Sequence, residues 1–294
     1  MEIAKIRREN PNRIKAVVSG LTHHVNQFFT LMLFGIFIVN SYGYCSDFQP
    51  DLKVGINGRT YPIGAQIVGN LGVSYPLWGD TGAWKYGYVR GGINLMTSGV
   101  VNRAGLELQV FPISILGISA GYDTGVRNFI PKWLDCDRYE CVGRVDRKNV
   151  RVNLVAAYSG FSFGFLARYE EFKSFASSSK LVYDETTLLV GQHSGENVFT
   201  MNPVVLYQVA DRMSVGFMSL YSHAIDTGGS SNLYGPVMTY APEPKLNILA
   251  GVGLDASPIV NSAISGFFVL QYNIKPSMSV MDLALRKTEN SSEK

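Results

Sequence analysis

Residues 103–110 read RAGLELQV, and apolar and polar residues alternate along this stretch. One set is Ala104, Leu106, Leu108 and Val110, and the other is Arg103, Gly105, Glu107 and Gln109. Successive side chains of a β-strand point to opposite faces. The period of two therefore predicts a strand with one apolar face and one polar face.

The same alternation recurs at residues 150–158, 161–170 and 246–255. Past residue 48 the helical spacing of i, i+3, i+4 and i+7 is hard to find. Only 17% of the residues are charged, yet no apolar run approaches the roughly 20 residues that a membrane-spanning helix needs. The sequence therefore predicts an all-β fold.

Alternation of this kind also fits a soluble sandwich or a lipocalin. The polar faces, however, carry Gly, Ser, Asn and Arg rather than Lys, Thr and Glu, which suits a crowded, wet lumen. Aromatic residues cluster near the predicted strand ends, like the interfacial girdles of a membrane barrel. They are Tyr75, Trp78, Trp84, Tyr86, Tyr88, Tyr158, Phe161 and Tyr207. Both details favour a transmembrane, antiparallel, up-and-down β-barrel.

Short connections rich in Gly, Pro or Asp are predicted at residues 77–83, 112–115, 159–160, 210–212 and 241–245. Interleaved with them are connections at residues 57–60, 97–100, 129–149, 175–195, 226–231 and 257–261, two of them long. Counting between these connections predicts about twelve strands, within a range of ten to fourteen. A further strand at residues 278–285 is the alternative for the end of the chain.

By this pattern, rather than by a specific motif, residues 48–275 resemble bacterial outer-membrane β-barrels. The resemblance implies a barrel at residues 44–275, surrounded by outer-membrane lipid and inserted by the barrel-assembly machinery, with a C-terminal segment at residues 276–294. Many such proteins end on an aromatic residue, whereas this chain ends on Lys294.

A signal peptide is predicted at residues 1–43, because five Lys and Arg residues precede the apolar run 28–39 and small residues follow it. Acylation of Cys45 and a retained anchor are the alternatives. Removing the five basic and two acidic residues of this leader from totals of 26 and 23 leaves a formally neutral chain. Charge therefore gives no argument for nucleic acid as a partner.

Charged residues on the predicted polar faces form the candidate lumen site. They are Arg90, Arg103, Glu107, Asp123, Arg127, Arg151, Arg168 and Glu170. In one interpretation the guanidinium groups pair with the carboxylates and fill a narrow barrel as a structural network. In the other, the excess of arginine forms a selectivity lining that favours anions or binds an anionic solute.

Cys136 and Cys141 lie in the charged stretch WLDCDRYECVGR, with four residues between them. An oxidising periplasm permits a disulfide there, and we predict one. A metal site that borrows Asp135 and Asp137 is the alternative, although soft and hard ligands without a nearby His make a poor zinc site.

No motif predicts a cofactor, since the glycines at 91–92 and 251–253 are not followed by a helix. Nor does the chain contain a passenger-sized soluble region of the kind an autotransporter carries. A lipid hydrolase on such a barrel uses a His and a Ser two residues apart on one strand. Here His193 is adjacent to Ser194, and His223 has Ser222 and Ser219 at spacings of one and four.

We therefore expect no enzyme but a channel or small-solute transport barrel. The alternative is a plugged barrel with a structural or surface-binding role. Its loops at residues 129–149 and 175–195 would fold over or into the lumen.

Overall fold

The computed structural model describes residues 48–61, 63–79, 85–127, 136–175, 181–184, 187, 189–192, 194–258 and 262–278. The predicted signal peptide and residues 279–294 lie outside these ranges, so the alternative strand at 278–285 is untested. No helix within the described ranges is long and apolar enough to cross a membrane.

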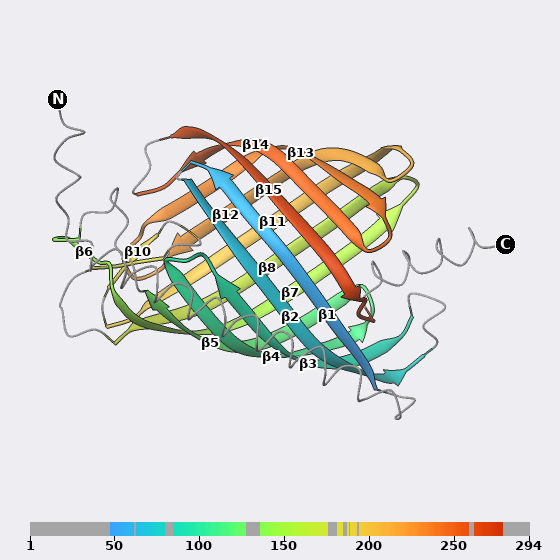
Figure 1. Cartoon of the computed structure of the whole chain (residues 1–294), viewed down its shortest axis with the longest axis horizontal. Helices are drawn as coiled ribbons and strands as arrows, with labels where there is room; N and C mark the ends of the chain where they lie inside the picture. The colour runs from blue at the N-terminus through green and yellow to red at the C-terminus, as the bar shows by residue number, and fades with distance from the viewer. Residues whose placement is uncertain are drawn as a thin grey trace, which may run out of the picture. The chain divides into compact units, whose positions relative to one another are not determined.

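Twelve antiparallel strands close into one barrel, which confirms the predicted fold class (Figure 1). They are β1 Gln49–Thr60, β2 Ile63–Trp78, β3 Gly87–Thr97, β4 Val101–Ile113, β5 Leu116–Arg127, β7 Gly143–Tyr158, β8 Phe161–Ser174, β11 Glu196–Ala210, β12 Met213–Ala224, β13 Ser230–Glu243, β14 Leu246–Ala256 and β15 Ala263–Lys275. Consecutive barrel strands are neighbours, and β1 pairs with β15 to close the ring.

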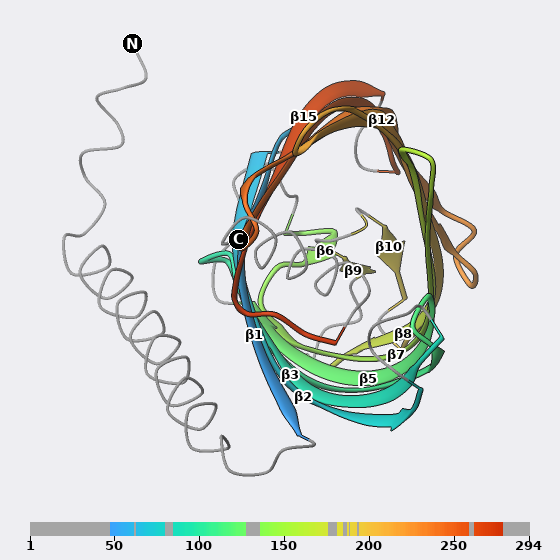
Figure 2. The same ribbon diagram turned by 90° about the vertical axis from the view of Figure 1, so that its right-hand side faces the viewer.

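Three short strands form a separate sheet in the order β10-β9-β6. They are β6 Tyr139–Glu140, β9 Leu181–Tyr183 and β10 Val190–Gly191. Seen along the barrel, this sheet falls within the outline of the ring (Figure 2), and from the side it lies at one end of the barrel, with β6 past the ends of the barrel strands (Figure 1). We call the sheet, together with Asp184, Thr187 and Leu189, the plug.

The connections alternate between the two ends of the barrel as predicted. At the turn end they are residues 79–86, 114–115, 159–160, 211–212 and 244–245. At the loop end they are residues 61–62, 98–100, 128–142, 175–195, 225–229 and 257–262, and the two longest contain the plug strands.

Two predicted loop boundaries are wrong, because residues 57–60 belong to β1 and residues 143–149 belong to β7. Residues 57–60 are polar on both faces, and residues 143–149 have a mixed inward set of Val145, Arg147 and Asn149, so both segments lack the apolar–polar alternation that marks a half-buried strand. At the loop end of β7 the outward residues include the exposed Arg144 and Lys148. Charged outward residues suit strand ends that extend past the lipid, because a strand needs only about 9–11 residues to span it.

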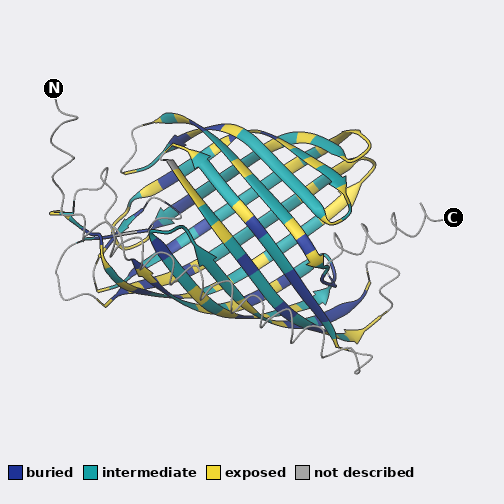
Figure 3. Cartoon of the chain, in the orientation of Figure 1, coloured by how far each residue is buried: buried dark blue, intermediate teal, exposed yellow. Residues whose placement is uncertain are grey.

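Exposed and less exposed residues alternate along the barrel strands (Figure 3), and many of the exposed residues on the outward face are apolar. Leu106 is 63% exposed and Leu108 is 56% exposed, whereas Glu107 between them is 6% exposed. Val150, Phe217 and Val252 are likewise more than half exposed on other strands. A soluble sandwich would bury this apolar set in its core, so the outward face is the one that contacts lipid.

Aromatic residues mark the turn end of this apolar face. Tyr75, Trp78, Tyr158, Phe161 and Tyr207 are all exposed there, as the girdle prediction requires. The prediction is wrong for two others: Tyr86 and Tyr88 are each 1% exposed and point inward. Even-numbered residues of β3 face the lumen, and the segment that leads into this strand keeps that alternation.

Candidate functional site in the lumen

The structure places all eight predicted lumen residues on the inward faces of β3, β4, β5, β7 and β8. Arg90 lies on β3, Arg103 and Glu107 on β4, Asp123 and Arg127 on β5, Arg151 on β7, and Arg168 and Glu170 on β8. Because these five strands are neighbours in the ring, the residues share one side of the lumen. We call the inward faces of these strands the charged wall.

Near the turn end, Arg90 forms a bidentate ion pair with Asp51 of β1. Its Nε donates to Asp51 Oδ2 at 2.8 Å, and its Nη2 donates to Oδ1 at 2.6 Å. Arg90 also donates to Asn70 of β2. The two side chains of the ion pair are 5% and 0% exposed, so this charge-assisted fork is shielded from water and holds β1 and β3 to a common geometry.

A second part of the same network continues toward β7. Asn94 accepts a hydrogen bond from Asn70 and donates to Glu107 Oε2 at 3.1 Å. Arg151 donates to the other carboxylate oxygen of Glu107. Glu107 thus bonds to an amide and a guanidinium group at once, which offsets the cost of burying its charge.

Nearer the loop end, Arg147 of β7 is the centre of a second cluster. Its side chain is 1% exposed and has three carboxylates around it. Nη2 lies 3.0 Å from Asp184 Oδ1 of the plug, Nη1 lies 3.7 Å from Asp123 Oδ1, and Nε lies 3.7 Å from Glu170 Oε1.

Arg103 and Arg168 lie beside Arg147 and pair with the same two carboxylates of the charged wall, Asp123 and Glu170. Arg103 Nε lies 3.4 Å from Asp123 Oδ1, and Arg168 Nη1 lies 3.5 Å from Glu170 Oε2. The structure thus brings three predicted arginines together with predicted carboxylates as ion pairs: Arg103 with Asp123, Arg151 with Glu107, and Arg168 with Glu170.

The sequence analysis misses Asp51, Arg147 and Asp184. Arg147 lies in a segment assigned to a loop, although Val145, Arg147 and Asn149 continue the inward alternation of Arg151. The segment has no apolar–polar pattern, but counting back in steps of two from Arg151 places Arg147 on the same face, and that spacing is the signal that identifies it. Asp184 carries no such signal, because it belongs to a long connection whose folding depends on the barrel around it.

Apolar packing fixes the plug against the wall at the loop end. One buried cluster combines Val182 and Leu189 of the plug with Val145, Phe172, Val198 and Ala224 of the barrel. All six residues are at most 2% exposed. Such close packing fixes the position of the plug, because every side chain in it fills space that water would otherwise occupy.

Polar contacts add to this packing. Arg127 Nη1 donates to the backbone carbonyl of Glu140 in β6 at 3.3 Å, and Ser174 Oγ donates to the Glu140 carboxylate at 3.3 Å. Cys136 and Cys141 form a disulfide next to this strand, as predicted, with their Cα atoms 5.6 Å apart.

Burial divides the lumen into two halves. At the loop end, inward residues on eight neighbouring strands are at most 8% exposed; they are Arg127, Val145, Phe172, Val198, Ser222, Ser231, Asp255 and Ser265. Nearer the turn end, Arg151 is 26% exposed, and inward residues such as Asn153, Leu249 and Gln271 are half-buried. Along these eight strands the loop-end half is therefore filled. The turn-end half is partly accessible on β7, β14 and β15, but it is closed near the turns, where Asp51, Tyr88 and Asn273 are at most 1% exposed.

The side of the lumen formed by β11–β15 is uncharged over its middle. Its inward residues there include Val204, Met218, Leu220, Val237 and Leu249. Among the described inward residues of these strands, charges occur only near the strand ends, at Glu196, Asp255 and Lys275. The charged wall thus faces a wall without charges.

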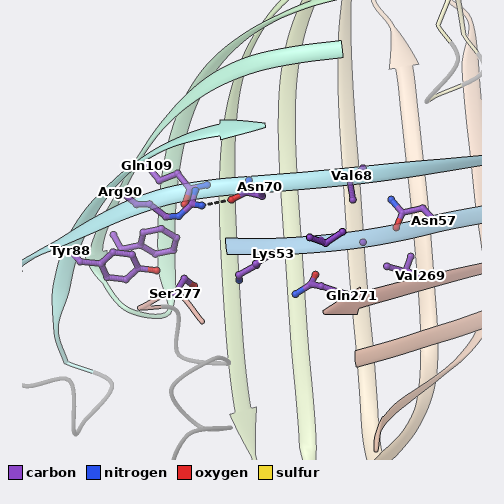
Figure 4. A pocket seen from close by; sticks show the side chains of 13 residues that line it. Lys53, Asn57, Val68, Asn70, Tyr88, Arg90, Gln109, Val269, Gln271 and Ser277 are labelled. Atoms are coloured by element: carbon purple, nitrogen blue, oxygen red, sulfur yellow. Dashed lines mark hydrogen bonds between the residues drawn. The ribbon is translucent and has the colours of Figure 1, made fainter. Parts of the chain in front are cut away.

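A cavity of about 350 Å³ lies in the turn-end half (Figure 4). Its polar lining includes Lys53, Asn57, Asn70, Gln109 and Gln271, with the Arg90 guanidinium at one side. Val68, Val269 and Tyr88 supply apolar surface. The mixture of amides, cations and apolar groups is typical of a site for a small polar solute.

The residues that follow β15 narrow this half from the turn end. Met278 is 0% exposed and packs against Tyr86 and Tyr88, with the partly buried Phe111 beside them. Tyr88 and Phe111 are stacked, with ring centroids 4.3 Å apart, and the Tyr86 hydroxyl donates to the Met278 carbonyl. Residues 276–278 thus lie across the turn end, and Ser277 lines the cavity.

Within the described residues, His223 gives no hydrolase geometry with a serine of its own strand. His193 lies outside the described residues. On β12, Ser222 faces inward and His223 faces outward. Ser219 shares the face of His223, but four residues of strand separate them by about 13 Å.

No family model and no curated protein matches the sequence. Among solved structures, the chain is similar to the β domain of the Bordetella autotransporter Brka, with 11% identity and a TM-score of 0.42 over 78% of this chain and 100% of that one. It is similar to the NanC porin with 13% identity and a TM-score of 0.41 over 75% and 98% of the two chains. For the KdgM porin the identity is 11% and the TM-score 0.39, over 76% and 98% of the two chains. At these values the similarities carry no argument about what this chain does.

Proposed function

We propose that the protein is an outer-membrane barrel that is closed at its loop end by its own plug and that receives a small solute in its turn-end half. The apolar outward face with its aromatic residues at the turn end supports insertion in a bilayer. In outer-membrane barrels the short turns face the periplasm, so the accessible half faces that compartment.

One observation carries this proposal: the inward residues at the loop end are buried on eight neighbouring strands. An open channel needs a wet lumen at both ends, and here Val182 and Leu189 of the plug are 0% exposed against the wall. The geometry therefore favours a barrel that is closed at rest over a permanently open channel.

The pairing of the arginines with carboxylates also favours a barrel that is closed at rest. Arg90, Arg103, Arg147, Arg151 and Arg168 each have a carboxylate within ion-pair distance. In the closed state the arginines act as a structural network. A selectivity role for them requires movement of the plug.

Conductance in planar bilayers tests this proposal. Wild-type protein is expected to remain closed, and Val182→Asp is expected to conduct, because a carboxylate cannot be accommodated in the apolar cluster that fixes the plug. Val142→Asp is the matched control, since Val142 is 49% exposed and tolerates a charge. Steady conductance of the wild type would contradict the proposal. So would a Val182→Asp barrel that does not conduct although it is folded, as judged by a change in its migration on a detergent gel after heating.

A further inference from the structure

The charged wall of the barrel has more arginines than carboxylates of its own. Its loop-end half and middle carry Arg103, Arg127, Arg147, Arg151 and Arg168, against Glu107, Asp123 and Glu170. The plug supplies the missing negative charge. Asp184 pairs with Arg147, and the Glu140 carboxylate is also buried at this interface, 7% exposed.

Among the carboxylates of the described residues, Asp184 is the nearest to Arg147. Its oxygen lies 3.0 Å from the guanidinium group, whereas the two wall carboxylates lie 3.7 Å away. Both members of the Arg147–Asp184 pair are 1% exposed. Movement of the plug removes this closest charge and leaves Arg103, Arg147 and Arg168 to share the carboxylates of Asp123 and Glu170, so the buried cluster then carries a net positive charge.

The plug presents Asp184 to the wall from a turn. Asp184 Oδ2 accepts hydrogen bonds from the backbone N–H of Thr187, at 2.9 Å, and from the Thr187 hydroxyl. Oδ1 is the oxygen that faces Arg147. Thr187 therefore holds one oxygen of the carboxylate, and the other oxygen accepts the hydrogen bond from Arg147.

Guanidinium groups continue from this point toward the accessible half of the lumen. Arg151 and Arg168 are directly opposite each other on β7 and β8. Their exposed fractions are 26% and 19%, against 1% for Arg147. Like charges opposite each other destabilise a pair of strands. In both residues the buried Nε has no hydrogen-bond acceptor.

From these observations we propose that Arg147, flanked by Arg103 and Arg168, is an oxyanion-binding site that Asp184 occupies in the closed barrel. The solute is then an anion whose carboxylate or phosphate group enters along Arg151 and Arg168 and replaces Asp184. The inference rests on the proposed function, and it names the chemical class of the solute. It requires no covalent step.

Chemical rescue of the full-length protein in lipid vesicles tests the site without measuring conductance. Asp184→Ala removes the carboxylate that the plug supplies. The heat-modifiability midpoint, the temperature at which half of the protein no longer runs as the folded barrel on a detergent gel, is recorded in sodium acetate or sodium phosphate. Acetamide controls for the shape of acetate, and sodium chloride controls for ionic strength. Asp184→Asn serves if the alanine variant does not fold. Glu171→Gln, which removes an exposed carboxylate of β8, is the control variant.

We expect Asp184→Ala to have a lowered midpoint that acetate or phosphate raises toward the wild-type value and that acetamide leaves unchanged. The response is expected to disappear in Asp184→Ala with Arg147→Gln, and to be absent in the wild type and in Glu171→Gln. A stronger response to one of the two anions identifies the preferred group. Equal effects of acetate and acetamide, or a response that persists without Arg147, would overturn the inference. The Val182→Asp conductance result stands apart from either outcome.

Discussion

The guanidinium group of Arg90 lies over Gly72 of the neighbouring strand, so close that a Cβ on Gly72 would stand 2.2 Å from Arg90 Nη2. Glycine at this position lets the arginine lie flat against the wall and reach Asp51. The position of the Arg90 side chain thus depends on the absence of a side chain at Gly72.

Gly72→Ala is therefore expected to displace Arg90 from Asp51 and to lower the free energy of unfolding by about 1–3 kcal/mol, the usual cost of overpacking. Gly91→Ala is the matched control, because a Cβ there meets no atom within 4 Å. Urea unfolding in lipid vesicles measures both. Equal stability of the two variants would show that the fork of Arg90 and Asp51 does not depend on Gly72.

The assignment of the outward face to lipid predicts the cost of a charge there. Leu106→Arg, in the middle of β4, should destabilise the barrel by about 2–4 kcal/mol, as expected for a charge near the bilayer midplane. Glu171→Arg, where an exposed carboxylate already faces outward near the loop end, should cost less than about 1 kcal/mol. The same unfolding measurement compares them, and similar costs at the two sites would argue against a bilayer around residue 106.

Closure of the turn end depends on the packing of Met278 against Tyr86 and Tyr88. Met278→Ala should weaken this packing by about 2 kcal/mol, and the segment should open on the order of 30-fold more often. Labelling of Ser277→Cys with a maleimide measures the opening, because Ser277 is 4% exposed in the closed arrangement. An unchanged labelling rate would mean that Met278 does not hold the segment in place.

The barrel follows from sequence because its strands obey a strict period of two. Residues 103–110 already separate a lipid face from a lumen face, and twelve strands result from counting turns between such stretches. The eight charged residues fall on the inward faces of β3, β4, β5, β7 and β8 for the same reason. The face that a strand residue occupies depends only on its position along the strand, so it can be predicted from the sequence.

The plug could not be predicted in this way. Val182, Asp184 and Leu189 of the plug contact barrel residues on other strands, among them Phe172, Arg147 and Ala224. These contacts form only when the barrel closes around the plug. The sequence offers only two long connections and leaves their position in the lumen open. The same limit explains why Tyr86 looks like a girdle residue, although its hydroxyl bonds to Met278, far along the chain.

Cysteine accessibility tests the central claim, that the loop-end half of the lumen is filled and the turn-end half is partly accessible. In a Cys45→Ser background, Asn153→Cys and Gln271→Cys are expected to react with a membrane-impermeant maleimide. Thr200→Cys and Ser222→Cys, whose parent residues are 2% and 1% exposed, are expected to stay protected until Val182→Asp loosens the plug. Labelling of Ser222→Cys in the otherwise native barrel as fast as Asn153→Cys would contradict the account.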